Sequence, residues 1–263
     1  MELAGKVAFV TGGGGGIGAG IGAALAEKGV RVVLADIDID RARKEAEAIG
    51  KATSAVRIDV TLEESWTEAR VQVEETIGAV DVLCNNAGIA TAPLLLDETP
   101  SDLFARMMAV NLTGVFYGIK AFAPGMKARG SGHIVNTSSL NGLLAHGTFG
   151  GYSASKFAVT GMTDALRQEL APYGVGVSTL YPGLTRSYMS LSDDTAAMMP
   201  DIPAEVREAQ MMDPLWLGRA VARAIENNSE HIITHPSAKA EVKRRQQVLL
   251  AAFGEPAQPG YTG

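Results

Sequence analysis

Short apolar runs alternate with longer amphipathic stretches along most of this chain. The apolar runs are rich in valine, isoleucine and leucine without polar alternation, a pattern typical of strands buried on both faces. They predict strands at residues 6–11, 31–35, 55–59, 81–85, 133–138, 175–181 and 231–234. The stretches between them have the spacing of helices and predict helices at residues 16–28, 41–49, 63–77, 101–128 and 153–171.

Regular alternation of strand and helix predicts an α/β fold. Parallel strands need crossover connections, and right-handed crossovers wind helices onto both faces of one sheet. We therefore expect a Rossmann-like, doubly wound parallel sheet of about seven strands with helices on both faces. No internal repeat and no linker rich in proline, serine or charge interrupts the pattern, so we expect a single domain over residues 1–263.

Composition narrows the possible partners. Apolar residues make up 46% of the 263 residues, enough for a sizeable core. The net charge of −6 weighs against a nucleic-acid partner, because neutralising phosphates needs a basic face. A basic run at residues 239–245 contains Glu241 and is better explained as a solvated helix face.

The single cysteine and the lack of a signal-peptide pattern at the first residues predict a reducing compartment. Cys84, the single cysteine, lies in an apolar run and is expected to be buried. One cysteine and four scattered histidines give no zinc ligand set, so we expect no metal. The start has no signal-peptide pattern, and no apolar run approaches the roughly 18 residues of a membrane span. A soluble, cytoplasmic protein without membrane contact is expected.

A glycine-rich turn follows the first predicted strand and opens the first helix, from Thr11 to Gly18. Glycines let the backbone approach a pyrophosphate, and the helix N-terminus offers N–H groups to it. The run of five glycines leaves two registers open. One uses Gly13, Gly15 and Gly18, and the other uses Gly12, Gly16 and Gly18.

An acidic residue, Asp36, ends the second predicted strand. A carboxylate there can accept hydrogen bonds from ribose hydroxyls and would repel a 2′-phosphate. The next residue, Ile37, is not a base, and Gly15 stands where an arginine or lysine could have met that phosphate. These three features favour NAD over NADP.

Three polar side chains suggest proton transfer. Ser139 follows the fifth strand, Tyr152 comes thirteen residues later, and Lys156 lies one helical turn further on. Residues at i and i+4 share a helix face, so the phenol and the ammonium are expected together. An ammonium, together with an oxidised nicotinamide, should lower the tyrosine pKa toward neutrality and make it a usable acid and base.

Together these pieces resemble the short-chain dehydrogenase/reductase family over nearly the whole chain. The matching motifs, in order, are Thr11–Gly18, Asp59 and Val60, Asn85 to Gly88, Asn111, Ser139, Tyr152 with Lys156, and Pro182 with Gly183. The resemblance implies a cofactor-binding half at about 1–130 and a catalytic and substrate-binding half at about 131–253. The glycine- and proline-rich tail, 254–263, is expected to be irregular.

The resemblance also implies roles. Tyr152 would be the general acid and base, and Lys156 would lower its pKa and hold the nicotinamide ribose. Ser139 would bond the substrate oxygen; Ser138 is the rival, but the spacing to Tyr152 favours Ser139. Asn111 would anchor a water in a proton relay, at a break in the long helix.

Most of the cofactor site is also implied by the resemblance, including Ser187 where threonine is usual. The residues expected to bind NAD are Gly12, Gly15, Gly16, Ile17, Gly18, Asp36, Ile37, Asp59, Val60, Asn86, Ala87, Gly88, Tyr152, Lys156, Pro182, Gly183, Thr185 and Ser187. The residues expected to meet the substrate are Ser139, Leu140, His146, Tyr152, Tyr188 and Met189. The methionine-rich segment 184–212 resembles a substrate lid, with core or interface packing as the alternative.

The resulting hypothesis is an NAD-dependent oxidoreductase. It would transfer hydride between the nicotinamide and a secondary alcohol or ketone that is apolar, cyclic or aromatic. The alternatives are a 3-oxoacyl-thioester reductase, which Asp36 weighs against, and a non-catalytic NAD-sensing protein, which commonly loses the tyrosine or lysine retained here. The family's helix pairing implies a homotetramer or homodimer through residues 101–128 and 153–171.

Overall fold

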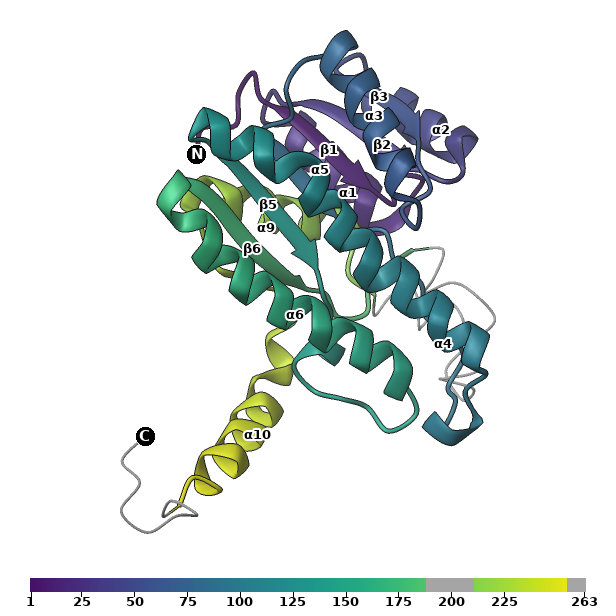
Figure 1. Cartoon of the computed structure of the whole chain (residues 1–263), viewed down its shortest axis with the longest axis vertical. Coiled ribbons are helices and arrows are strands. Elements are labelled where there is room, and N and C mark those ends of the chain that lie inside the picture. Colours follow the sequence, from purple (N-terminus) through teal and green to yellow (C-terminus); the bar gives the residue numbers. More distant parts are fainter. Residues whose placement is uncertain (188–210, 255–263) are drawn as a thin grey trace.

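The computed structural model describes residues 1–187 and 211–254 (Figure 1). In this part of the chain a seven-stranded, all-parallel sheet has the order β3-β2-β1-β4-β5-β6-β7, which confirms the predicted fold class. The strands are β1 (Val7–Thr11), β2 (Arg31–Asp36), β3 (Thr53–Arg57), β4 (Val82–Asn85), β5 (Gly132–Thr137), β6 (Val175–Tyr181) and β7 (His231–Ile233).

Helices cover both faces of the sheet (Figure 1). One face packs against α1, α2 and α9, and the other against α3, α5 and α6. The helices are α1 (Gly16–Ala26), α2 (Ile39–Ile49), α3 (Glu63–Thr76), α4 (Ser101–Met108), α5 (Gly114–Arg129), α6 (Gly150–Leu170), α9 (Pro214–Asn227) and α10 (Lys239–Ala251). None of the described helices combines the length and the apolar character needed to cross a membrane.

Successive residues of a strand pack into two separate core layers, one on each face of the sheet. Val10 of β1 packs toward α1 and α9, whereas its neighbour Phe9 packs toward α3 and α5. Phe9 lies 6.0 Å from the Trp66 ring and 5.1 Å from the Phe122 ring, measured between centroids. Because both sides of the central strands are buried, their sequences are mainly apolar, as the pattern indicated, although β5 and β6 also bury polar side chains. Cys84 is fully buried in the first layer, as expected.

The helix predicted at 101–128 is interrupted. Between α4 and α5 the backbone makes a π-helical turn, Ala109–Thr113, and then continues as a helix. One residue too many for an α-helical turn is accommodated there, which rotates Asn111 inward and buries it completely. The predicted break at Asn111 is therefore confirmed, in the form of a bulge within a continuous helical path.

Two element assignments needed correction. The third strand begins at Thr53 rather than residue 55, because its ladder partner β2 sets the register and an edge strand does not need an apolar start. The helix α9 was not predicted, although Asp213 caps the Leu215 N–H at 2.9 Å and Pro214 occupies the first turn. The tail 255–263 lies outside the described residues.

Candidate active site

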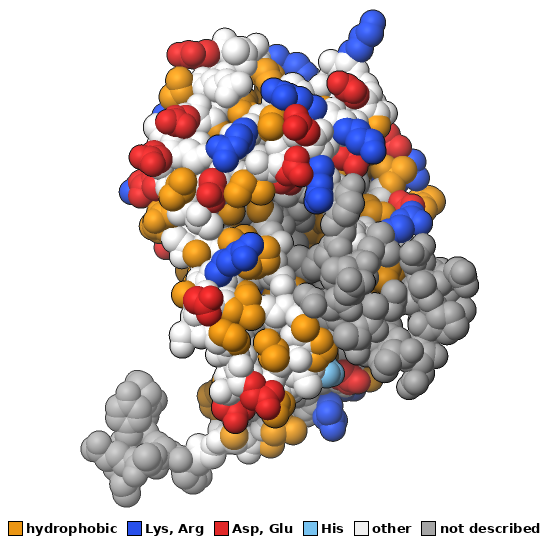
Figure 2. Space-filling model, turned by 90° about the vertical axis from the view of Figure 1, so that its right-hand side faces the viewer, with side chains coloured by type: hydrophobic (Ala, Val, Ile, Leu, Met, Phe, Trp, Pro, Cys, Tyr) orange, Lys and Arg blue, Asp and Glu red, His pale blue; other side chains and the backbone are white. Residues whose placement is uncertain are grey.

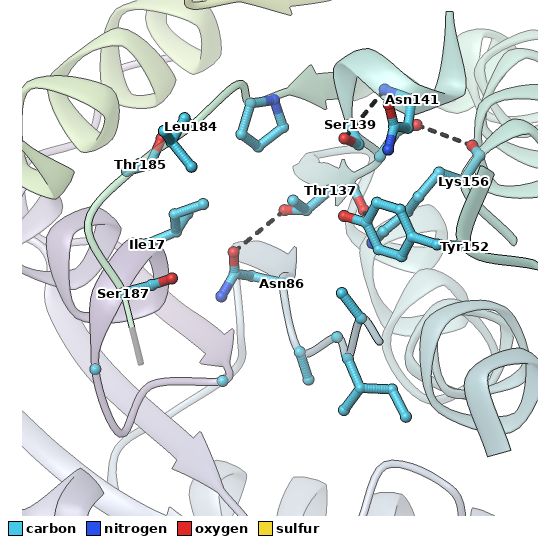
Figure 3. A pocket seen from close by; sticks show the side chains of 18 of the residues that line it. Ile17, Asn86, Thr137, Ser139, Asn141, Tyr152, Lys156, Leu184, Thr185 and Ser187 are labelled. Carbon is cyan, nitrogen blue, oxygen red and sulfur yellow. Dashed lines mark hydrogen bonds between the residues drawn. The ribbon is translucent and has the colours of Figure 1, made fainter. Parts of the chain in front are cut away.

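A cavity of about 540 Å³ opens at the carboxyl ends of the strands (Figure 3). It lies beside β1 and β4, the neighbouring strands after which the chain continues to opposite faces of the sheet. One end is formed by the glycine turn and Asp36, the other by Ser139 and Tyr152. Its lining comprises Gly12, Gly14, Gly15, Ile17, Asp36, Arg41, Asn86, Ala87, Gly88, Ile89, Ala90, Thr137, Ser138, Ser139, Asn141, Phe149, Tyr152, Lys156, Pro182, Gly183, Leu184, Thr185 and Ser187.

The glycine turn has little room for side chains. Gly12 and Gly16 have φ of +67° and +54°, a region that favours glycine. A Cβ on Gly18 would lie 2.1 Å from the Gly12 oxygen, so only glycine fits there. The first register is restricted as well, because Gly15 has a φ of +153° and a Cβ on Gly13 would lie 2.7 Å from the Leu34 Cβ, so both registers consist of positions that require glycine.

Helix α1 starts directly after this turn, and no side chain caps it. The first N–H groups of a helix have no partner within the helix, so they can bind an anion placed in the turn, where the helix dipole also favours negative charge. A glycine cradle, a helix start without a side-chain cap and the carboxylate of Asp36 beside them together fit a dinucleotide. Within residues 1–187 and 211–254, no group of three or more His, Cys, Asp or Glu side chains could hold a metal ion.

Asp36 is locked in place at the end of β2. Its Oδ2 accepts a hydrogen bond from the Gly14 N–H at 2.9 Å, and its Oδ1 accepts one from the Asp38 N–H at 3.0 Å. Arg41, which the sequence reasoning missed, also lines this end, with its Nε 3.1 Å from Asp38 Oδ2. A basic side chain therefore lies near the carboxylate, and it comes from the first turn of α2. Ile37, the residue after Asp36, is 59% exposed and does not line the cavity.

The motif at residues 85–88 joins three strands. The Asn86 side chain donates to the Thr11 carbonyl at 3.0 Å, and the Thr11 hydroxyl accepts the N–H groups of Asn86 and Ala87 at 2.9 and 3.0 Å. Thr137 of β5 donates to Asn86 Oδ1 at 3.5 Å (Figure 3). These bonds hold the cavity floor where β1, β4 and β5 end.

Asp59 and Val60 lie outside the cavity lining. Asp59 Oδ1 accepts the N–H and the hydroxyl of Thr61 at 2.9 and 2.6 Å, and the Val60 carbonyl accepts the Trp66 indole at 3.0 Å. Both residues thus shape the turn between β3 and α3. Their expected contact with NAD stays a prediction.

Tyr152 and Lys156 project together from α6 into the cavity (Figure 3). Lys156 is 3% exposed, its Nζ donates to the Thr137 carbonyl at 2.9 Å, and it lies 5.7 Å from the Tyr152 ring centroid. Burial lowers the pKa of Lys156 to about 8. Burial also raises the pKa of Tyr152, against a lowering influence from the Ser139 hydroxyl.

The lowering of the Tyr152 pKa expected from the Lys156 ammonium together with an oxidised nicotinamide stays a prediction. Within the protein itself, desolvation of the phenolate is the largest influence and raises the pKa. Both groups are pushed toward their neutral forms because both are enclosed. Any lowering of the Tyr152 pKa must come from charge that enters the cavity.

The two serines after β5 point to different partners. The Ser138 hydroxyl donates to the Lys156 carbonyl at 2.8 Å and lies 3.0 Å from the Thr160 hydroxyl, so it fastens β5 to α6. Ser139 Oγ accepts the Asn141 N–H at 3.1 Å and faces the cavity beside Tyr152 (Figure 3). The geometry supports Ser139 over its rival.

Asn111 reaches the site only indirectly. Its Oδ1 accepts the Ile89 N–H at 2.8 Å, while its Nδ2 donates to the Ile89 carbonyl at 2.9 Å and to the Ser155 hydroxyl at 3.0 Å. The amide therefore ties the loop after β4 to helix α6. Its expected part in a proton relay stays a prediction.

The predicted substrate residues are only partly brought together. Leu140 lies outside the lining and donates its N–H to the Pro182 carbonyl at 3.0 Å. His146 is exposed, bonded to Thr148 at 3.2 Å, and does not line the cavity. Tyr188 and Met189, with most of the expected lid, lie outside the described residues.

Ile89, Ala90 and Asn141, which were not predicted, line the cavity near the serine and tyrosine. Their short distance along the chain from Gly88 and Ser139 was the available signal. Phe149, from the loop before Tyr152, and Leu184, from the expected lid segment 184–212, line the same wall. Thr185 and Ser187, which were predicted, also line it, and a Cβ on Gly16 would lie 2.5 Å from the Ser187 Cβ.

The sheet order, the glycine turn and the serine, tyrosine and lysine at one cavity define a nucleotide-binding α/β oxidoreductase. A family model for short chain dehydrogenases matches residues 6–197. The chain belongs to the short-chain dehydrogenase/reductase family.

Two curated enzymes illustrate the relatives. The 3-alpha-(or 20-beta)-hydroxysteroid dehydrogenase of Mycobacterium tuberculosis is 39% identical over 189 residues, covering 72% of each chain. The trans-4-hydroxycyclohexanecarboxylate dehydrogenase of Sinomonas cyclohexanicum is 38% identical over 198 residues, covering 72% of this chain and 76% of that one. A short chain dehydrogenase/reductase from Burkholderia phymatum, solved in complex with NAD, has a TM-score of 0.86 at 28% identity, covering 98% of this chain and 99% of that one.

Proposed function

We propose that this protein is an NAD-dependent dehydrogenase or ketone reductase acting on an apolar secondary alcohol or ketone that is cyclic or aromatic. The observation that carries the proposal is the single cavity that joins a dinucleotide cradle to a serine, a tyrosine and a lysine. The NAD-bound structural relative supports the same reading. The whole chain would act as one domain.

The cofactor would lie along the cavity with its pyrophosphate in the turn formed by Gly12, Gly15 and Gly16. The fixed carboxylate of Asp36 would accept the adenosine ribose hydroxyls and repel a 2′-phosphate. Gly88, Pro182 and the backbone of the following residues would border its nicotinamide end. When bound, the nicotinamide supplies hydride transfer, which no side chain can provide.

The side chains would handle the substrate proton. In reduction, the Tyr152 phenol would donate its proton to the substrate oxygen; in oxidation, it would take that proton back. Burial raises the pKa of Tyr152 and so favours the protonated phenol, the form that donates in reduction. Ser139 would donate a hydrogen bond to the same oxygen, and the Lys156 ammonium would hold the cofactor ribose and favour the phenolate.

The substrate end supports a cyclic, apolar ligand. Ile89, Phe149 and Leu184 provide apolar walls around the polar centre at Ser139 and Tyr152. Two relatives are named for hydroxysteroid and hydroxycyclohexane substrates, which are secondary alcohols on rings. We therefore favour a ring-borne hydroxyl or ketone.

The test is a screen of steroid, cyclohexanol and benzylic alcohols with NAD⁺, together with the matching ketones with NADH, following NADH absorbance. Turnover with one ring class and a clear preference for NAD over NADP is expected. Absence of turnover with every alcohol and ketone, despite NADH binding, would contradict the enzymatic proposal. Stronger activity with NADP would contradict the role of Asp36.

We also infer the setting in which the enzyme works. Acidic and basic side chains are interspersed over the face in Figure 2, which suits a protein without a nucleic-acid partner. The cytoplasm is the compartment that fits a buried, unpaired Cys84. A homodimer or homotetramer is the assembly we favour.

A further inference from the structure

His235 follows β7 and hydrogen-bonds the backbone of two residues that line the cavity, Gly183 and Leu184. Its Nδ1 lies 3.0 Å from the Gly183 N–H nitrogen and 2.8 Å from the Thr234 hydroxyl, while its Nε2 lies 3.2 Å from the Leu184 carbonyl oxygen. The imidazole therefore contacts both the N–H and the C=O side of one short backbone segment. That segment, residues 182–184, lines the cavity.

The partners determine the form of the imidazole. Because the Gly183 N–H can only donate, Nδ1 must accept and carries no hydrogen. Nε2 then carries the hydrogen and donates it to the Leu184 carbonyl. One neutral tautomer thus serves the Gly183 donor and the Leu184 acceptor, which also accepts the Met212 N–H at 3.1 Å.

The contact between His235 and Gly183 is also close in space. A Cβ on Gly183 would lie 2.6 Å from the His235 Cγ, so the ring packs against a bare backbone. On its other side the same segment is held by the Leu140 N–H, which donates to the Pro182 carbonyl at 3.0 Å. Leu140 follows Ser139 directly, so the two attachments align the segment with the proposed catalytic serine.

We propose that His235 is a positioning residue that sets residues 182–184 at the nicotinamide end of the cavity. His235 lies beyond residues 6–197, the part matched by the family model. Its role would make the region after α9 part of the working site, although no side chain there lines the cavity. This inference rests on the proposed function, since it assumes that the cofactor borders this segment.

The test compares three variants with the wild type. His235→Phe keeps a ring against Gly183 and removes both hydrogen bonds, whereas His235→Asn keeps an acceptor near the Nδ1 position. His231→Phe, on β7 itself and exposed, is the matched control. Amide hydrogen exchange at Gly183, NADH affinity by fluorescence titration and the thermal midpoint are measured for each.

In His235→Phe we expect faster exchange at Gly183 and about tenfold weaker NADH binding, with a thermal midpoint close to wild type. His235→Asn should recover part of both losses, and His231→Phe should match wild type. Unchanged exchange at Gly183, or faster exchange with unchanged NADH affinity, would overturn the inference. Because these readouts need no substrate, a wild type that binds NADH but oxidises no alcohol would refute only the proposed function.

Discussion

At the level of single residues, the active-site pair is governed by burial. Lys156 and Tyr152 are both enclosed by α6, β5 and the cavity wall, and both lose solvation when charged. Since the Lys156 pKa remains at about 8, the ammonium is still the main form at neutral pH, next to a neutral phenol. This is the protonation state that a proton donor to a ketone oxygen requires.

Replacing Tyr152 by Phe tests that assignment. The change removes the proton donor but keeps the ring against Lys156, so kcat should fall by roughly 10²–10⁴-fold, the usual contribution of a general acid or base. NADH affinity, measured by fluorescence titration, should stay within about twofold because a hydroxyl adds little to cofactor binding. Retention of most of the turnover would refute the role of the phenol, and Tyr173→Phe on the surface serves as the control.

His133 predicts a pH-dependent stability. It is 2% exposed in β5, its Nε2 lies 2.8 Å from the Ser178 hydroxyl, and burial lowers its pKa to about 4. Because the unfolded histidine binds its proton nearer pH ~6.5, the unfolded state gains protons first as the pH falls. The contribution of His133 is therefore complete above pH ~6.5 and is lost progressively toward pH ~4, by an amount on the order of 3 kcal/mol.

Urea unfolding at several pH values measures this loss. In His133→Gln, which stays neutral throughout, the free energy of unfolding should fall less steeply between those pH values than in the wild type. His231→Phe, which alters an exposed histidine, should keep the wild-type slope. Equal slopes for wild type and His133→Gln would show that other groups cause the acid sensitivity.

At the level of elements, the π-helical turn between α4 and α5 orients the Asn111 side chain toward the interior. A regular α-helix would leave Asn111 at a different angle, and the amide could not reach both Ile89 and Ser155. The bulge thus costs some regular helix bonding and gains three hydrogen bonds to buried groups.

Asn111→Ala should destabilise the protein. It leaves the N–H and C=O of Ile89 without their side-chain partner, so the free energy of unfolding should fall by ~2–4 kcal/mol. Asn141→Ala is the matched control: its amide side chain makes no hydrogen bond to the described residues, and we expect a change of less than about 0.5 kcal/mol. Denaturant unfolding gives both values, and similar losses in the two variants would contradict this account of the turn.

At the level of the whole molecule, several apolar side chains remain uncovered. Phe116 of α5 is 49% exposed, and Phe104 of α4, on the same helical path, is also exposed. Helix α10 extends away from the body and buries none of its side chains (Figure 1). Surfaces of this kind are commonly covered by a second copy.

Light scattering after size-exclusion chromatography should therefore give a mass that is a multiple of 27.5 kDa. Phe116→Asp should shift the distribution toward the single chain, because it places a charge in the expected contact. Val71→Asp, on α3, changes another exposed apolar residue outside that contact and should leave the mass unchanged. A wild type that runs only as one 27.5 kDa species would contradict the assembly.

Local pattern was enough for much of the architecture. Strand and helix periods depend on neighbouring residues, so the seven strands, the glycine turn and the face shared by Tyr152 and Lys156 were predictable. The missed or misplaced features depend on distant partners. β3 takes its start from β2, Arg41 joins the cavity through the packing of α2, and His146 stays on the surface despite its closeness in sequence to Tyr152.

The amino-acid sequence by itself determined the order of the elements and the kind of chemistry placed at the ends of the strands. Only the tertiary structure decided which groups are enclosed, and therefore that burial acts to raise the pKa of Tyr152. It also decided that His235 meets Gly183, 52 residues away in the chain. Solvation and long-range contact depend on how the layers pack, which no local pattern specifies.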